Sequence, residues 1–105
     1  MKNSRILIVE DEQIIAENLR FILNEHGYDY VDVAIDATEA KSLFEQTKYN
    51  LVLMDINLGD TSIIDGIDLI NWLLKKYAFI FMYVTANADE KTIQKATKTK
   101  PAGYI

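Results

Sequence analysis

The sequence has no cysteine, one proline and one histidine among its 105 residues. The missing cysteine excludes a disulfide framework and a thiolate metal site, and the single His26 excludes histidine-rich metal sites and most histidine-based catalytic dyads. Even the apolar run from Ala78 to Val84 is far shorter than the ~20 residues that span a bilayer. The residues after Met1 lead into a run too short for a secretory signal. These absences predict a cytoplasmic protein with no membrane contact.

Positive charge is also scarce, with 11 Lys and Arg against 16 Asp and Glu and a formal net charge of -5. Nonspecific binding to nucleic acid draws on Lys and Arg that neutralise phosphates, so we expect no direct nucleic-acid contact from this segment. The length, with 50% apolar and 26% charged residues, predicts one compact domain over residues 1–105.

Three apolar runs are unbroken, as is typical of strands buried on both faces: Ile6–Val9, Leu51–Met54 and Phe79–Val84. Val31–Ile35 and Gly103–Ile105 are predicted as further strands. Apolar residues at helical spacing separate the strands, in the sets Ile15, Leu19, Ile22 and Leu23, then Ala40, Leu43 and Phe44, then Ile67, Ile70, Leu74 and Tyr77. A polar-faced helix is expected over Asp89–Thr97.

This alternation predicts an α/β fold with a doubly wound, five-stranded parallel sheet and helices on both faces. The last predicted strand reaches Ile105 with no helix after it. We therefore expect the final helix of a (βα)5 arrangement to be missing, so that the chain is a domain truncated at its C-terminus.

Reactive side chains follow three of the predicted strands. Glu10 and Asp11 follow the first run, Asp55 and then Asn57 follow the central run, and Thr85 follows the third. Ligands of open α/β sheets bind at the carboxyl ends of the strands, and neighbouring strands lie ~4.8 Å apart. We therefore expect a carboxylate cluster with a hydroxyl beside it.

Two carboxylates ~4 Å apart repel each other by about 4 kcal/mol at an effective dielectric near 20, so such a cluster needs a cation or a raised pKa. Mg²⁺ prefers oxygen ligands and also coordinates phosphate. A bound ion would allow Asp55 to attack a phosphoryl group while Thr85 donates a hydrogen bond to it. Taken singly, Glu10 and Asp11 are equally well explained as helix caps and Asp55 as a loop residue. The coincidence of three strand ends favours a site.

The chain resembles the receiver domains of response regulators, the CheY-like family with a flavodoxin-like fold. The residues that carry the resemblance are Ile6 to Glu12, Leu51 to Leu58, Asp65-Gly66, Val84-Thr85-Ala86 and Gly103-Tyr104-Ile105. They extend over nearly the whole chain.

The resemblance implies a signalling switch rather than an enzyme, in which a sensor histidine kinase or phosphotransfer protein places a phosphoryl group on Asp55. It implies that Mg²⁺ is held by Asp11, Asp55, Glu10 (partly through water) and the backbone carbonyl of Asn57. Thr85 would then be the hydroxyl residue that moves toward the phosphate. Tyr104 would be the aromatic residue that changes rotamer when Thr85 moves. A homodimer and regulation of an output domain or partner are also expected of the family.

The chain departs from the family pattern in two places. It lacks a proline soon after Asp55, and Lys100-Pro101 precedes Tyr104, whereas the family's Lys-Pro follows the switch aromatic. We interpret Lys100-Pro101 as part of a turn. Two alternatives stay open: a Mg²⁺-dependent phosphohydrolase, which would need a second Asp where this chain has Asn57, and a pseudo-receiver that takes no phosphate.

Two further residues are predicted to have structural roles. His26 is expected to interact with the C-terminal end of a helix, and Trp72 is expected to be partly buried by packing.

Overall fold

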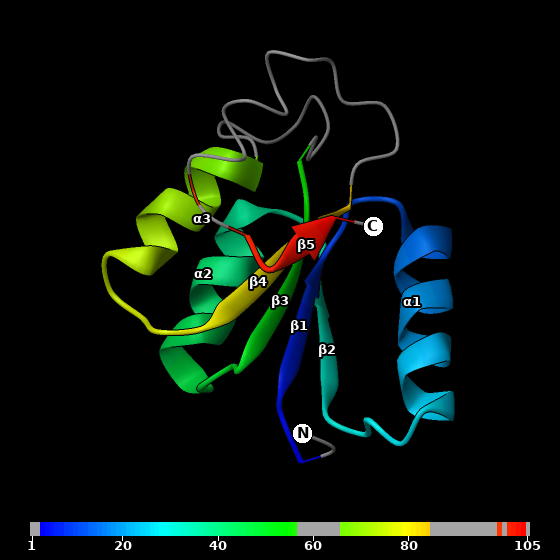
Figure 1. The fold of residues 1–105 in the computed structure, drawn as a ribbon. Helices are drawn as coiled ribbons and strands as arrows, with labels where there is room; N and C mark the ends of the chain where they lie inside the picture. The colour runs from blue at the N-terminus through cyan, green and yellow to red at the C-terminus, as the bar shows by residue number, and fades with distance from the viewer. Residues whose placement is uncertain (1–2, 57–65, 85–98, 100, 105) are drawn as a thin grey trace.

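The computed structural model describes residues 3–56, 66–84, 99 and 101–104, with the backbone alone described at 103 and 104. The described elements alternate between strand and helix along most of the chain (Figure 1). In chain order they are β1 (Ile6–Val9), α1 (Gln13–Glu25), β2 (Val31–Ala34), α2 (Ala37–Gln46), β3 (Leu51–Asp55), α3 (Gly66–Leu74), β4 (Ile80–Val84) and β5 (Gly103–Tyr104).

The strands form one parallel sheet in the order β2-β1-β3-β4-β5. β1 pairs with β2 on one side and with β3 on the other, and all four of its residues are buried. A strand with covered faces and two neighbours needs apolar side chains at every position, which explains its unbroken run. β5 is a two-residue segment that pairs with β4 at the edge of the sheet.

Helices cover both faces of the sheet, α1 on one side and α2 with α3 on the other (Figure 1). Successive side chains of β1 pack on opposite faces of the sheet, because side chains alternate along a strand. Ile6 and Ile8 belong to the core under α1, and Leu7 and Val9 to the core under α2 and α3. The predicted α/β class and the parallel sheet between helical layers are confirmed.

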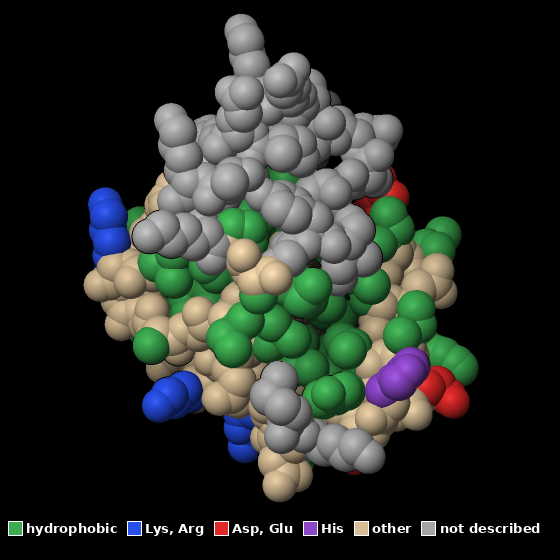
Figure 2. All heavy atoms as spheres, viewed as in Figure 1, with side chains coloured by type: hydrophobic (Ala, Val, Ile, Leu, Met, Phe, Trp, Pro, Cys, Tyr) green, Lys and Arg blue, Asp and Glu red, His purple; other side chains and the backbone are tan. Residues whose placement is uncertain are grey.

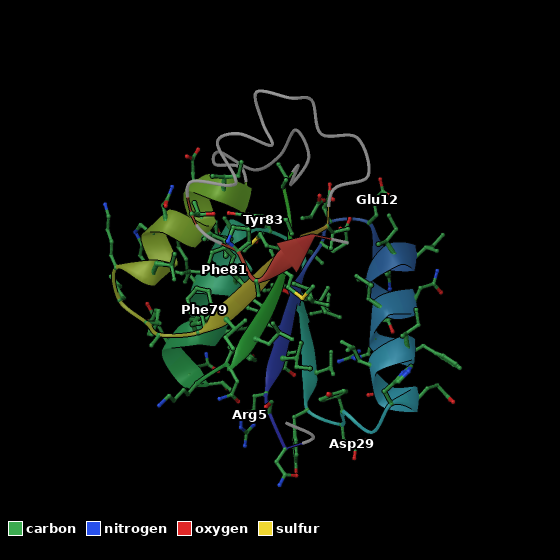
Figure 3. The ribbon with its side chains drawn as sticks, in the orientation of Figure 1. Arg5, Glu12, Asp29, Phe79, Phe81 and Tyr83 are labelled. Atoms are coloured by element: carbon green, nitrogen blue, oxygen red, sulfur yellow. The ribbon has the colours of Figure 1, made fainter. Side chains whose placement is uncertain are left out.

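An aromatic row on β4 extends the core under α2 and α3. Phe79, at the residue before the strand, lies 6.0 Å from Phe81 between ring centroids, and Phe81 lies 5.7 Å from Tyr83, both pairs edge to face (Figure 3). The three rings follow period-two spacing, so they lie on the same face of β4. On the face that Figure 2 shows, hydrophobic side chains gather over the middle of the sheet.

The helix ends follow local chemistry. α1 ends before His26 and Gly27, and Gly27 has a φ of 91°, a conformation that glycine adopts without steric cost. The Nδ1 atom of His26 is 2.9 Å from the carbonyl oxygen of Ile22, so the predicted helix-end role is confirmed. Asp36 caps the start of α2, and its carboxylate accepts a 2.8 Å hydrogen bond from the Glu39 N–H.

Two predicted core positions were wrong, and a third residue lies outside its predicted helix. Tyr77 packs against the core but lies beyond α3, which ends at Leu74. Within α3, Leu73 is fully buried whereas Leu74 is 37% exposed. The helix faces the sheet through Leu73, one residue from the predicted position, which turns Leu74 toward solvent. Ile22 was predicted on the core face of α1, but it is 55% exposed because Leu19 and Leu23 occupy the side nearer the sheet.

Trp72 is half-buried against the core, as predicted. The Nζ atoms of Lys41 and Lys76 each lie 4.3 Å from the centroid of its rings, within the range of a cation–π interaction.

The complete five-stranded (βα)5 arrangement stays a prediction. The helix predicted over Asp89–Thr97 lies outside the described residues, and only two residues represent the fifth strand. Within the described ranges, no helix is long and apolar enough to cross a bilayer.

Candidate functional site

The carboxyl ends of β1 and β3 lie side by side in the sheet. The register pairs Val9 with Met54, which places Glu10 and Asp55 next to each other where the two strands end. The Glu10 N–H donates to the carbonyl of Ala34 at 2.9 Å, so the backbone stays in sheet geometry at this residue. The predicted convergence at this edge of the sheet is therefore a consequence of parallel pairing.

Three carboxylates meet at this edge. Glu10, Asp11 and Asp55 each offer an oxygen, and the three oxygens lie within 4.8 Å of one another. Their surroundings differ: the Glu10 side chain is buried at 3% exposure, Asp55 is half-buried and Asp11 is exposed. The cluster therefore opens to solvent on one side and has a buried acid on the other.

Glu10, the buried acid of this cluster, has a raised pKa. The pKa of Glu10 is raised from 4.5 to about 8, first by burial and then by the nearby charges of Asp55 and Asp11. The N–H of Glu12 donates to Glu10 Oε1 at 3.2 Å and acts in the opposite direction by stabilising the charged form. Without a cation, Glu10 is therefore largely protonated at neutral pH.

The helix-cap alternative for these acids is not supported by the geometry of α1. Glu12 occupies the N-cap position and makes no side-chain cap hydrogen bond. Glu10 Oε1 accepts a hydrogen bond from the N–H of Glu12, which precedes the first residue of α1. Asp11 is exposed. The two acids beside β1 are turned toward Asp55 rather than toward the orphan N–H groups of the helix.

A hollow of about 590 Å³ borders the acidic cluster between the start of α1 and the loop after β2. Glu10 and Asp11 form part of its lining, as do Gln13, Ala16, Glu17, Val33, Ile35 and Asp36. Two of the three carboxylates of the cluster therefore border this hollow.

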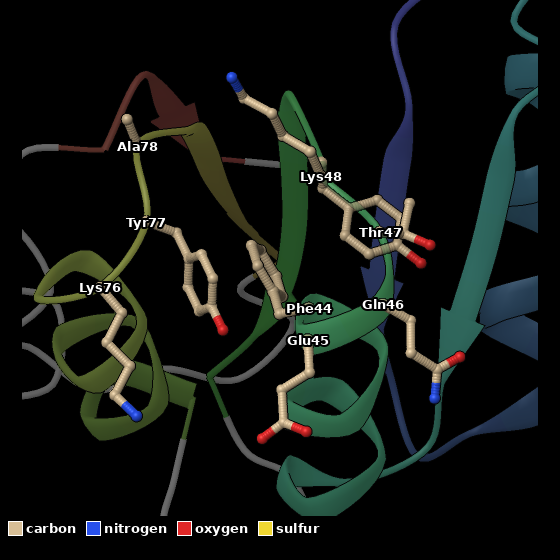
Figure 4. A pocket seen from close by; sticks show the side chains of 9 residues that line it. Phe44, Glu45, Gln46, Thr47, Lys48, Lys76, Tyr77 and Ala78 are labelled. Carbon is tan, nitrogen blue, oxygen red and sulfur yellow. The ribbon is translucent and has the colours of Figure 1, made fainter.

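A second hollow, of about 410 Å³, is lined by Phe44 and Tyr77 with Lys48 and Lys76 nearby (Figure 4). The rings of Phe44 and Tyr77 lie 5.0 Å apart. It is formed where α2 ends and β4 approaches, at the amino end of the sheet, so it is separate from the carboxylate cluster.

Other residues predicted for the site fall outside what the structure describes. Asn57, Thr85 and Lys100 belong to the undescribed ranges. Tyr104 is described by its backbone alone, which pairs with Tyr83 in β4. Their predicted roles at the site therefore stay predictions.

Two residues near the site had no predicted role. Gly66 begins α3 and donates its N–H to the carbonyl of Ile56 at 2.9 Å, directly after Asp55. Tyr83 is fully buried in β4, and its hydroxyl lies 2.7 Å from Thr99 Oγ1. The sequence signal for Gly66 was its place in the Asp65-Gly66 pair; Tyr83 had none beyond its apolar strand.

The chain belongs to the response regulator receiver domain family, because the model of that family matches residues 6–105. The fold and the acidic edge of the sheet agree with that membership. A signalling role as the receiver domain of a response regulator follows.

Individual relatives support the same assignment. The transcriptional regulatory protein PdtaR of Mycobacterium tuberculosis is 33% identical over 101 residues, which are 96% of this chain and 48% of PdtaR. The phyllosphere-induced regulator PhyR of Methylorubrum extorquens is 37% identical over 84 residues, 79% of this chain and 31% of PhyR. The chain thus spans about half or less of these curated relatives.

Among solved structures, a CheY-like response regulator receiver domain protein from Methanospirillum hungatei superimposes with a TM-score of 0.85 at 30% identity. The match covers 98% of this chain and 80% of that one.

Proposed function

We propose that this domain is a phosphoacceptor switch, in which Asp55 takes a phosphoryl group from a sensor histidine kinase or phosphotransfer protein. The observation that carries the proposal is the meeting of Glu10, Asp11 and Asp55 within 4.8 Å at the carboxyl ends of neighbouring strands. In transfer from a histidine, an oxygen of Asp55 forms a bond to phosphorus while the bond from phosphorus to the donor nitrogen breaks.

The donor set fits Mg²⁺. Its three carboxylate oxygens are hard ligands, and a divalent cation would offset the burial and the neighbouring negative charges that raise the pKa of Glu10. Glu10, Asp11 and Asp55 would hold the ion together with the backbone carbonyl of Asn57, which the family resemblance adds. A bound ion would screen the charge of Asp55 from that of an incoming phosphoryl group. Glu10 must release its proton for this ligand set to form.

The consequences of phosphorylation rest on the family resemblance. Thr85 and Tyr104 are the proposed switch residues, and the proposed output is an effector domain or a partner. The relative PdtaR, which is named a transcriptional regulatory protein, supports a regulatory output. We propose a cytoplasmic signalling protein without enzymatic turnover of its own and without direct nucleic-acid contact from this domain. A homodimer is part of the same proposal.

Incubation with acetyl phosphate and Mg²⁺ separates this function from its alternatives. A receiver gains one acid-stable, base-labile acyl phosphate and consumes little donor. A phosphohydrolase releases inorganic phosphate continuously, and a pseudo-receiver does neither. Continuous release or no labelling would overturn the proposal.

A further inference from the structure

The first residue of α3 lies against the backbone of the proposed phosphoacceptor. A Cβ atom placed on Gly66 would lie 2.0 Å from the carbonyl oxygen of Asp55, 2.9 Å from the Asp55 carbonyl carbon and 3.0 Å from the Ile56 Cα. The Gly66 N–H also donates to the Ile56 carbonyl at 2.9 Å. Even alanine therefore does not fit unless the peptide after Asp55 and the start of α3 move apart.

The need for glycine at this position is steric. Gly27 is the glycine with a positive φ in the described part of the chain, so Gly66 has a backbone conformation open to other residues. The atoms that a Cβ would meet are backbone atoms, which cannot rotate away as the end of a flexible side chain would. The close approach is thus what excludes a side chain.

Both partners of this contact are held by the core. Ile67, Leu69, Ile70 and Leu73 anchor α3 at zero exposure, and Met54 and Ile56 on either side of Asp55 are buried at 0% and 1%. A tightly packed interior transmits such a displacement instead of absorbing it. A separation at Gly66 that displaces the Asp55–Ile56 peptide would change the direction in which the Asp55 carboxylate leaves β3.

We propose that Gly66 is a positioning residue for the acidic site: its missing side chain lets α3 rest on the Asp55–Ile56 peptide and aligns Asp55 with Glu10 and Asp11. The inference rests on the proposed function, because it assumes that these carboxylates bind Mg²⁺ together. Mg²⁺ demands near-ideal octahedral geometry, so a displaced carboxylate should weaken binding.

The test compares two glycine-to-alanine variants of the whole chain by isothermal titration with Mg²⁺. Gly66→Ala should weaken Mg²⁺ binding by about 10- to 100-fold, the usual effect of losing a group that orients a metal ligand. Gly27→Ala is the matched control, because it strains the backbone at the far end of α1 and leaves the acidic edge unchanged. Its Mg²⁺ affinity should equal that of the wild type.

The outcomes are distinct. Wild-type affinity in Gly66→Ala overturns the inference alone, as does an equal loss in both variants, which would indicate general loosening. No Mg²⁺ binding by the wild type overturns the proposed metal site and the inference with it.

A second measurement uses only the wild type and does not depend on a variant folding. In an NMR titration with Mg²⁺, the Gly66 amide signal should shift with the same midpoint as the binding isotherm, while the Gly27 signal stays in place. A Gly66 signal that does not respond overturns the inference.

Discussion

Carboxyl oxygens of Glu10 and Asp55 lie within 4.8 Å of each other, where the neighbouring strands β1 and β3 end. One of these acids is buried and the other is half-buried, and Asp11 adds a third carboxylate beside them. The arrangement is unfavourable when all three are charged, so protons and cations compete for it.

The metal-free protein should lose stability as pH rises from about 5 to 8. Glu10 has a folded-state pKa of about 8 against an ordinary value of 4.5, so over this window the folded state binds a proton that the unfolded chain has released. Proton binding by the folded state makes the free energy of unfolding fall as pH rises. Glu10→Gln carries no such proton, so thermal melts in chelator should show a weaker pH dependence for the variant. Equal slopes would contradict the pKa assignment.

Mg²⁺ should stabilise the fold. At ~100 times its dissociation constant, it should add about 2.7 kcal/mol to the free energy of unfolding if the unfolded chain does not bind it. Asp55→Asn should remove most of this gain and, in chelator, melt above the wild type because a negative charge is gone from the three crowded carboxyl groups. The measurement is a pair of thermal melts for each protein, with Mg²⁺ and with chelator. Coincident wild-type melts would count against a metal site here.

Leu73 and Leu74 offer a matched test of how α3 faces the core. Leu73→Ala should reduce the free energy of unfolding by about 2–5 kcal/mol, since it leaves a cavity at a fully buried position. Leu74→Ala removes the same atoms from a residue that is 37% exposed and should cost less than half as much. Urea unfolding of the two variants measures both values, and similar losses would mean that α3 is rotated from the orientation described.

Much of the fold was predictable because its central strands are marked by short, continuous apolar runs in the sequence. β1 and β3 are buried on both faces, so their sequences are continuous apolar runs, and parallel pairing places the residues after them at one edge. The cluster of Glu10, Asp11 and Asp55 follows from those two facts. The sequence alone therefore predicts where these carboxylates lie.

Features set by tertiary contacts were not predictable in the same way. Tyr77 continues the helical spacing in the sequence, but α3 ends at Leu74. The residues between them are Lys75 and Lys76, so no glycine or proline signals the end of the helix. The contact between Gly66 and Asp55 depends on how α3 returns over the end of β3. No periodicity encodes such a contact.

The most direct test of the central claim is intact-mass analysis of the wild type and Asp55→Asn after incubation with acetyl phosphate and Mg²⁺. Asp55 is the proposed acceptor because it ends β3 beside the two acids that follow β1. The wild type should gain one phosphoryl group, lost on mild base treatment, and Asp55→Asn should gain none. Undiminished labelling of Asp55→Asn, or a wild type that stays unlabelled, would contradict the account.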